Sequence, residues 1–200
     1  MLGTTDLSIV VVNDGQYTLS EGVGTEVDPT TLTTQEILEK VKAAGIVGLG
    51  GAGFPTHVKL APKDPAAIKY VIANGAECEL YITCDDQLMR NYADEIVGCL
   101  KIMLQLFPNA EGVVLIEENK PEAIAAVQKV CANENKIHVH PVHVKYPQGG
   151  ERAIMDVVAG KHIKLGMLPA DVGCVVDNVE TVVAVYKAVI QGRPVMDRVV

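Results

Sequence analysis

Short apolar runs of strand length alternate with longer amphipathic stretches over most of this sequence, and no other feature constrains the fold as strongly. The predicted strands are IKYVIAN (68–74), GVVLIEE (112–118), KIHVHPVHV (136–144) and GCVVDN (173–178). The predicted helices cover residues 34–44, with Thr34 as the cap, and residues 85–107, 121–132, 151–159 and 179–191. Strands that are joined through helices run parallel, with the helices packed on the faces of the sheet. The sequence therefore predicts an α/β fold with a parallel sheet covered by helices, in which Pro141 places the third strand at an edge or a bulge.

The two ends of the chain do not show this alternation of predicted strands and helices. Residues 1–30 are predicted to be the tail of an N-terminal β-rich module, with a strand at 7–12 that the turn NDG (13–15) closes. Residues 31–192 form the main domain, and residues 193–200 are predicted to begin a C-terminal β domain that is missing. We therefore expect this chain to be a piece of a longer protein.

Charge and cysteine usage exclude several classes of function. The formal net charge of −8 at pH 7 argues against a nucleic-acid partner, because phosphates would be repelled. No apolar run is long enough to span a bilayer, and we expect no signal peptide because the start lacks a basic region followed by a long apolar one. No two cysteines stand at C-x-x-C spacing, which argues against a locally built zinc knuckle or iron–sulfur cluster: Cys78, Cys84, Cys99, Cys131 and Cys174. Free thiols in a reducing cytosol are expected.

Four loops carry the residues that could bind a ligand. Three of them follow predicted strands: NGAECELYITCDD (74–86), YPQGGE (146–151) and DNVET (177–181). The fourth is the glycine loop GIVGLGGAGFPTHVKL (45–60). Ligands of parallel sheets bind outside the carboxyl ends of the strands. We therefore expect the four loops to converge on one crevice.

The glycine loop matches the dinucleotide fingerprint in spacing but not in context. Gly48-x-Gly50-x-x-Gly53 follows a predicted helix rather than a strand, and Pro55 interrupts the unit. Glycines let main-chain N–H groups approach an anion or a flat ring, and a short helix that starts at Pro55 can offer its N-terminus to phosphate. Lys59 adds a positive charge one turn further on. The alternative is a tight connection that needs glycine only for its backbone conformation.

The loop 74–86 is rich in carboxylates. Asn74, Glu77 and Glu79 are expected to project from the end of a strand and to face hydroxyl or N–H donors, such as a ribityl chain or the edge of a flavin. A divalent metal is the rival ligand, and a metal-dependent hydrolase using Glu77, Glu79 and Asp86 is the corresponding alternative function. Asp85 and Asp86 also stand where a helix start favours negative charge, and we interpret them in that way.

The other two strand-end loops lead into helices. Gly149 and Gly150 permit close approach of a ligand, and Glu151 stands in the first turn of the next helix. Asn178 is predicted to cap the last helix, and Thr181 could bond a ligand oxygen.

Neither a metal site nor a catalytic constellation stands out elsewhere. His138 and His140 share one face of a predicted strand, but no third metal ligand is evident. No Ser-His-Asp or Cys-His arrangement is apparent, so no catalytic side chain is predicted.

Taken together, the four motifs in this order resemble RnfC, the soluble subunit of the Rnf electron-transport complex, over about residues 45–192. They are more distantly similar to the FMN-binding flavoprotein subunit of respiratory complex I. The resemblance implies a Rossmann-like domain that binds FMN noncovalently, accepts hydride from NADH and passes electrons to iron–sulfur clusters. It also implies an N-terminal β-rich module, a ubiquitin-like β domain and two [4Fe–4S] clusters, the last two lying beyond this chain. A fragment without clusters is expected to be inactive alone.

The resemblance also implies roles for individual residues. The positions that would bind FMN or the nicotinamide dinucleotide are Gly51, Gly53, Phe54, Lys59, Asn74, Glu77, Glu79, Gly149, Gly150, Glu151, Asn178 and Thr181. Gly51 and Gly53 would lie against the flavin, and the FMN phosphate would lie near Asn178 and Thr181. Phe54 would stack on the dinucleotide, with Glu79 as its acidic neighbour. The chain departs from the complex I pattern at Val47 and Leu49, where arginines stand, and from both relatives at Leu80, where proline is usual.

Partners and location follow from the same resemblance. It implies other subunits of a membrane-bound, ion-translocating complex as partners, and a cytoplasmic place peripheral to the membrane without insertion into it. A cobalamin-reductase or amino-acid-reductase electron carrier is an alternative within the family. A flavin-free assembly module of a redox complex is an alternative outside this function.

Overall fold

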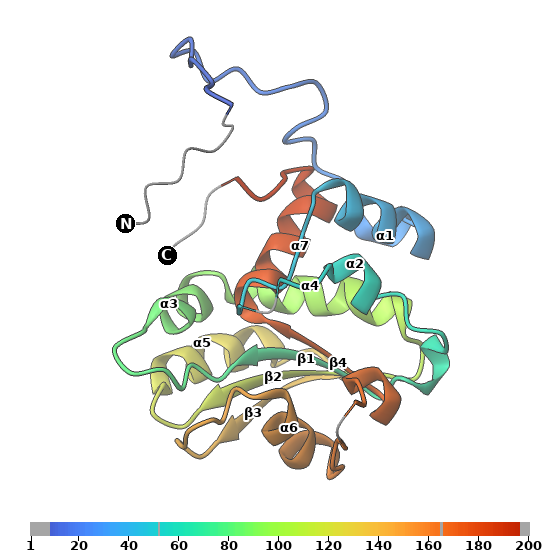
Figure 1. The fold of residues 1–200 in the computed structure, drawn as a ribbon, viewed down its shortest axis with the longest axis vertical. Helices are drawn as coiled ribbons and strands as arrows, with labels where there is room; N and C mark the ends of the chain where they lie inside the picture. Colours follow the sequence, from blue (N-terminus) through green and yellow to red (C-terminus); the bar gives the residue numbers. More distant parts are fainter. Residues whose placement is uncertain (1–8, 52, 165, 197–200) are drawn as a thin grey trace.

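A single parallel sheet organises the computed structural model, which describes residues 9–51, 53–164 and 166–196 (Figure 1). The four strands lie in the order β3-β2-β1-β4 and all neighbours pair in parallel. Their bounds are β1 (Tyr70–Gly75), β2 (Glu111–Glu117), β3 (Ile137–Val142) and β4 (Cys174–Asn178). The predicted α/β fold is confirmed, and β3, which contains Pro141, lies at an edge of the sheet as expected.

Helices cover both faces of the sheet. The α-helices are α1 (Thr34–Ala43), α2 (Thr56–Lys59), α3 (Cys84–Asn91), α4 (Ala93–Leu106), α5 (Pro121–Cys131), α6 (Glu151–Ile154) and α7 (Val179–Gln191). A π-helical turn η3 (Met155–Ala159) continues α6, and short 3-10 turns are η1 (Pro29–Thr31), η2 (Pro65–Ala67) and η4 (Pro169–Val172). Helices α3, α4, α5 and α7 lie on one face, and α6 lies on the other (Figure 1).

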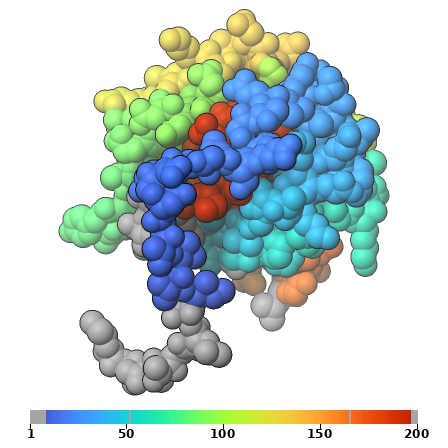
Figure 2. Space-filling view, turned by 90° about the horizontal axis from the view of Figure 1, so that it is seen from above, coloured from blue at the N-terminus to red at the C-terminus, as the bar shows by residue number. Residues whose placement is uncertain are grey.

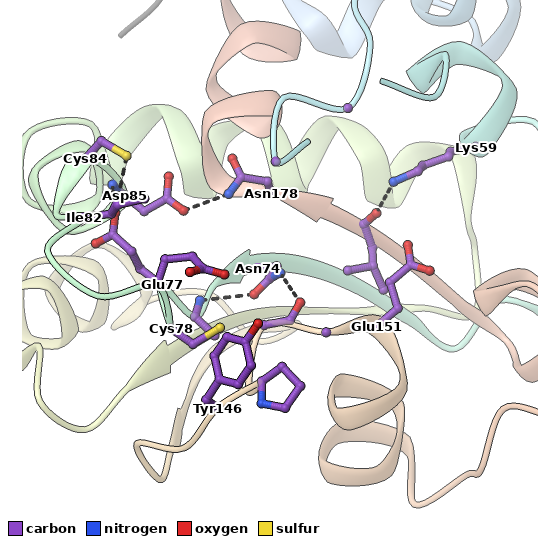
Figure 3. A pocket seen from close by; sticks show the side chains of 18 residues that line it. Lys59, Asn74, Glu77, Cys78, Ile82, Cys84, Asp85, Tyr146, Glu151 and Asn178 are labelled. Atoms are coloured by element: carbon purple, nitrogen blue, oxygen red, sulfur yellow. Dashed lines mark hydrogen bonds between the residues drawn. The ribbon is translucent and has the colours of Figure 1, made fainter. Parts of the chain in front are cut away.

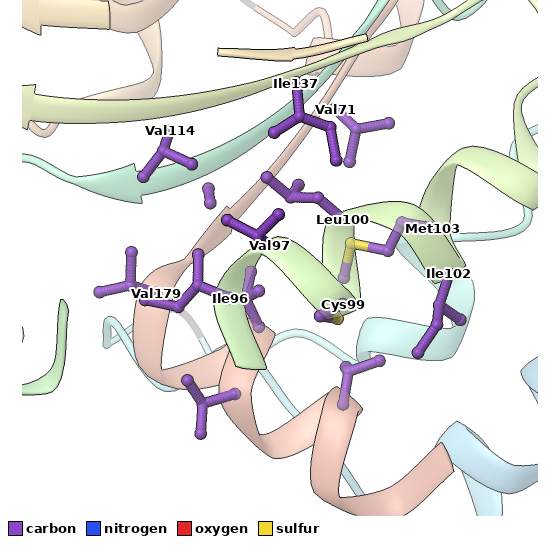
Figure 4. Packing of buried hydrophobic residues seen from close by; sticks show 14 of the residues in the cluster. Val71, Ile96, Val97, Cys99, Leu100, Ile102, Met103, Val114, Ile137 and Val179 are labelled. Atoms are coloured by element: carbon purple, nitrogen blue, oxygen red, sulfur yellow. The ribbon is translucent and has the colours of Figure 1, made fainter. Parts of the chain in front are cut away.

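The larger core lies between the sheet and α4 (Figure 4). Ile96 and Leu100 stand one turn apart on α4 and are fully buried, and Val71 and Val114 reach them from β1 and β2. Burying an aliphatic side chain of this size contributes about 1.5–3 kcal/mol relative to leaving it exposed. These contacts fix the position of β1 against α4 and thereby the position of the loop that follows β1.

The strand order creates a switch point beside β1. The chain runs from β1 to β2 and β3 on one side, with α3, α4 and α5 on one face of the sheet, and then returns to place β4 on the other side of β1. The connections that leave β1 and β4 therefore separate at their carboxyl ends. In open α/β sheets this geometry leaves a crevice where ligands bind.

Two predicted helix features differ from the structure. The long helix predicted at 85–107 is broken at Tyr92, whose backbone angles (φ −126°, ψ 32°) separate α3 from α4. The Lys187 ammonium lies 4.8 Å from the centre of the Tyr92 ring. The cap of α1 is Thr33 rather than Thr34, because Thr33 and Glu36 form a reciprocal capping box.

The N-terminal segment crosses the end of α7 (Figure 2). The predicted strand at 7–12 is wrong where it can be checked: residues 7 and 8 lie outside the described residues, and residues 9–12 form no strand and are 83–92% exposed. The expected turn is present, with the Gly15 N–H donating to Asn13 Oδ1. Strand pairing needs a partner, and the described residues offer none here. The segment is held further along, where Val27 N–H donates to the carbonyl of Ile190 at 2.8 Å.

Candidate functional site

A pocket of about 490 Å³ opens at the carboxyl ends of β1 and β4 (Figure 3). All four loops that were expected to converge contribute to its wall. The lining residues are Gly48, Gly50, Lys59, Asn74, Ala76, Glu77, Cys78, Glu79, Ile82, Cys84, Asp85, Tyr146, Pro147, Gly149, Gly150, Glu151, Val176 and Asn178. Eight of the twelve predicted site residues are among them.

The glycine loop is a small hairpin rather than a fingerprint turn. Val47 and Pro55 form an isolated antiparallel bridge, and Gly48 N–H donates to the Phe54 carbonyl at 2.8 Å. The loop enters the pocket through Gly48 and Gly50. A Cβ on Gly50 would lie 3.1 Å from the Asn178 Cβ, so a side chain there would crowd the start of α7. The absence of a side chain thus lets the loop approach that helix closely.

Four predicted residues do not line the pocket. Gly51 and Gly53 adopt positive φ angles (105° and 62°), and a Cβ on either would meet nothing within 4 Å. Phe54 is 45% exposed on the same loop. Thr181 is fully buried, and its hydroxyl accepts a hydrogen bond from Leu49 N–H at 2.9 Å. Thr181 therefore fastens the glycine loop to α7 instead of facing the cavity.

Asn74 ties the end of β1 to the second glycine loop. Its Oδ1 accepts from Ala76 N–H, and its Nδ2 donates to the Gly149 carbonyl, both at 3.1 Å. A Cβ on Gly149 would lie 2.5 Å from the Ala76 carbonyl oxygen. Only glycine allows the two main chains to pass this closely.

Glu77 is fully engaged in holding the start of α3. Its carboxylate accepts from Asp85 N–H at 2.8 Å, from Asp86 N–H at 3.3 Å and from Cys84 Sγ, and it pairs with the Lys120 ammonium at 3.2 Å. Burial opposes its ionisation, but these hydrogen bonds prevail and hold the pKa of Glu77 below its usual value. Glu77 is thus an ionised helix cap in the pocket wall.

Asp85 has a larger role than its place in the sequence suggested. Its Oδ2 accepts from Asn178 Nδ2 at 2.8 Å, while Asn178 Oδ1 caps α7 by accepting from Glu180 N–H. Burial raises the pKa of Asp85 to about 6; the Asn178 hydrogen bond lowers it, and the charges of Glu77 and Glu180 raise it further. The link joins the first turns of α3 and α7 across the pocket (Figure 3). Its position in the first turn of a helix gave no sign of this contact.

Lys59 supplies positive charge to the pocket. Its ammonium donates to the Val176 carbonyl at 2.8 Å and to Asp177 Oδ1 at 3.2 Å. Among the described lining residues it is the one cationic side chain, facing the carboxylates of Glu77, Glu79, Asp85 and Glu151. The predicted cation is therefore present, but it is held by β4 before any ligand binds.

The carboxylates of the hydrolase alternative do not gather. Among the described residues, the group that could hold a metal consists of Glu77, Cys84 and Asp85. Asp86 is instead ion-paired with Arg90 at 3.0 Å within α3. The pocket therefore combines glycine-lined walls, hydrogen-bond acceptors and a helix N-terminus, which suits a ligand with hydroxyl and N–H donors and an anionic end.

The chain is similar to several known proteins. Residues 41–187 match the family model described as the Nuo51 FMN-binding domain. The chain is 41% identical over 192 residues to the C subunit of the proton-translocating ferredoxin:NAD(+) oxidoreductase complex of Clostridium ljungdahlii, covering 96% of this chain and 42% of that protein. It is 38% identical to the C subunit of the Na(+)-translocating ferredoxin:NAD(+) oxidoreductase complex of Acetobacterium woodii, covering 98% of this chain and 44% of that protein.

A Pseudomonas aeruginosa protein and a solved structure extend the comparison. The C subunit of the ion-translocating oxidoreductase complex of Pseudomonas aeruginosa is 44% identical, covering 82% of this chain and 21% of that protein. The crystal structure of an NAD+-reducing [NiFe]-hydrogenase in the H2-reduced state superposes with a TM-score of 0.67 at 25% identity, over 81% of this chain and 32% of that one. The chain thus spans less than half the length of the curated relatives named here. Within the described residues, no helix has the length and apolar character needed to cross a membrane.

Proposed function

This chain belongs to the family of the Nuo51 FMN-binding domain, and we propose that it is the FMN-binding domain of an RnfC-type, NADH-linked electron-transport subunit. The observation that carries this function is the pocket that four separate loops form together at the carboxyl ends of β1 and β4. On this proposal, residues 31–192 are a Rossmann-like FMN- and NADH-binding domain, residues 1–30 are the tail of an N-terminal β-rich module, and residues 193–200 begin a C-terminal β domain.

The pocket suits FMN in size and chemistry. Its volume of about 490 Å³ lies within the range of about 300–1,000 Å³ usual for small-molecule sites. The N-terminus of α7, beside Asn178, favours a phosphate group. Gly50 and Gly149 let the segments that form the wall pack closely against Asn178 and Ala76, while Glu79 and Glu151 can accept hydrogen bonds from ribityl hydroxyls.

Bound FMN would supply the redox chemistry, accepting hydride and releasing electrons singly. The residues of this chain would position and tune it. The Asn74–Gly149 hydrogen bond holds the loop after β1 against the second glycine loop. The Asp85–Asn178 hydrogen bond joins the start of α3 to the start of α7. Lys59 would donate to a polar atom of the flavin. No side chain needs to act as a general acid or base.

The electron acceptors and partners lie outside this chain on the same proposal. NADH would be the hydride donor, with Phe54 stacking on the dinucleotide and Glu79 beside it. The [4Fe–4S] clusters would be carried by the remainder of a full-length protein. The names of the relatives describe ion-translocating complexes, so we propose that other subunits of such a complex, located at the cytoplasmic side of a membrane, are its partners.

A flavin titration tests the proposal directly. Adding FMN to the 200-residue chain is expected to quench flavin fluorescence with one site per chain. Riboflavin, which lacks the phosphate, is expected to bind at least about tenfold more weakly because it cannot use the α7 N-terminus. Anaerobic NADH should then bleach the bound flavin. Failure of FMN to bind at any concentration would contradict the assignment, and binding without reduction by NADH would contradict only the donor.

A further inference from the structure

Asp177 is a buried carboxylate that lies behind the pocket wall and is not one of the lining residues. It lies on β4 directly before Asn178, and its side chain is 1% exposed. One oxygen, Oδ1, is paired with the Lys59 ammonium at 3.2 Å, whereas Oδ2 has no hydrogen-bond partner among the described residues. A buried carboxylate oxygen without a partner is costly, because it has lost its hydration and gained nothing in return. Such a group calls for a functional explanation.

Lys59 connects this carboxylate to the pocket. An ammonium group has three N–H donors, and within the described part of the chain two of them are taken, by the Val176 carbonyl and by Asp177. The side chain is 21% exposed and lines the cavity (Figure 3). The remaining donor is therefore available to a ligand, while the carboxylate behind it decides how much net positive charge that ligand meets.

We infer that Asp177 is a positioning residue that sets, through Lys59, the charge presented to the bound flavin; this rests on the proposed FMN function. When Asp177 is ionised, the Lys59–Asp177 pair carries no net charge. When Asp177 is neutral, the pair carries one positive charge. Charge near the flavin ring tunes its electronics, and a reduced flavin carries more negative charge than an oxidised one. An ionised Asp177 therefore weakens the binding of reduced FMN relative to oxidised FMN and lowers the reduction potential.

Within the described part of the chain, three titratable or charged groups face Asp177. Burial raises the pKa of Asp177 to about 6; the Lys59 ammonium on α2 acts in the opposite direction, and the Glu151 carboxylate at the start of α6 adds to the rise. The third group is the Cys99 thiol of α4, whose own pKa is raised well above its usual value by burial and by Asp177, so it remains neutral. The pair is therefore neutral above about pH 6 and gains positive charge below it.

The decisive measurement is the midpoint potential of FMN bound to the chain, relative to free FMN, between about pH 5 and pH 8, on either side of the Asp177 pKa. The Asp177→Asn variant keeps the shape of the side chain but removes its charge. At the alkaline end, this variant is expected to bind reduced FMN about tenfold more tightly, relative to oxidised FMN, than the native chain does. For a two-electron couple, that ratio raises the midpoint potential of bound FMN by about 30 mV. Towards the acidic end the difference from the native chain should disappear, because native Asp177 is then protonated.

Two controls separate this role from a general effect of charge or stability. Glu134→Gln makes the same change of charge in another lysine–carboxylate pair, Lys101–Glu134 at 2.8 Å, outside the pocket. It should leave the potential unchanged. In a Lys59→Gln background the ammonium that lowers the pKa of Asp177 is gone, so burial keeps this carboxyl neutral over the pH range tested. Asp177→Asn then changes no charge and should have no further effect.

Several outcomes would overturn the inference. An unchanged potential in Asp177→Asn at the alkaline end would do so, as would an equal shift in the Lys59→Gln background. If Asp177→Asn does not fold, the native chain and Lys59→Gln are compared instead, and their difference in potential must grow as the pH falls; a constant difference contradicts the inference. A chain that binds FMN but shows no such dependence leaves the proposed function intact, whereas a chain that never binds FMN contradicts both.

Discussion

Gly149 is a residue at which one added carbon would collide with main chain. A Cβ there would lie 2.5 Å from the Ala76 carbonyl oxygen, and Asn74 holds the same carbonyl-bearing turn in place. Because the obstacle is backbone, it cannot rotate away. We expect Gly149→Ala to lower the free energy of unfolding by about 1–3 kcal/mol, the range found for overpacked sites. Urea denaturation measures this loss.

Gly150→Ala is the matched control for that substitution. A Cβ on Gly150 would lie 3.5 Å from the Pro147 carbonyl oxygen, an ordinary contact, and its backbone angles (φ −69°, ψ 135°) suit any residue. The expected loss is below about 1 kcal/mol, as for a substitution that replaces glycine at a helix N-cap. Equal losses in the two variants would contradict the steric explanation.

Residue-level predictions from the sequence were only partly right. The residue types of the pocket and their loops could be predicted, but not which way each side chain points. The Val47–Pro55 bridge turns the glycine loop so that Gly48 and Gly50, rather than Gly51 and Gly53, meet the cavity. No rule of local spacing encodes that bridge, because it depends on how a hairpin closes. The roles of individual residues toward FMN stay predictions.

Helix α3 depends on a cap that comes from another element. Glu77, in the loop after β1, accepts two N–H groups of its first turn and pairs with Lys120. Replacing it by glutamine is expected to lower the free energy of unfolding at neutral pH by about 1–3 kcal/mol, from a lost cap and an unpaired lysine. The pKa of Glu77 is lowered on folding, so this stabilisation is complete above the unfolded value of about 4.3 and is lost as the pH falls through the folded pKa.

The measurement is denaturant unfolding of both proteins from neutral pH downwards, with the difference shrinking at the acidic end. Glu122→Gln serves as the control. Glu122, like Glu77, is a carboxylate that contacts α3, but it does so by an ion pair with Arg90, and its side chain is 71% exposed. Exposed ion pairs contribute about 0–1 kcal/mol, so that variant should be nearly neutral. A difference between native chain and Glu77→Gln that persists unchanged at low pH would refute the capping role.

At the level of elements, hydrophobic periodicity predicted both ends of all four strands of the sheet to within about two residues. It failed at Tyr92, because apolar residues continue at near-helical spacing on both sides of a single non-helical residue. It also failed at residues 9–12, whose composition favours a strand although no partner strand is described. Hydrophobic periodicity shows which side chains of a segment are suited to burial, but not whether another element is present to cover them.

The whole domain is predicted to tolerate loss of its first twenty residues. From residue 9 onward, where the structure describes the segment, Gly22 and Val27 attach it to the end of α7: the Gly22 carbonyl lies beside Gly192, and Val27 N–H donates to the Ile190 carbonyl. Deleting residues 1–20 should therefore change stability by less than about 0.5 kcal/mol, as for changes away from packed features. The FMN affinity should stay within about twofold, since exposed termini rarely contribute to a site.

Thermal unfolding and FMN titration of the shortened chain check this expectation. A longer deletion through residue 33 is the useful contrast, because it removes the Thr33 cap of α1 and should cost about 1 kcal/mol. If the shorter deletion already abolishes FMN binding, the boundary proposed at residue 31 is wrong.

The two outermost strands differ in how they discourage pairing with another molecule. Pro141 leaves the outer edge of β3, which faces away from β2, without one amide donor, and the ammonium of Lys59 already occupies a carbonyl of β4. Both devices interrupt the row of groups that a foreign strand would need as a template. Neutralising Lys59 is therefore expected to promote self-association of the chain at high protein concentration, in addition to any effect on flavin binding.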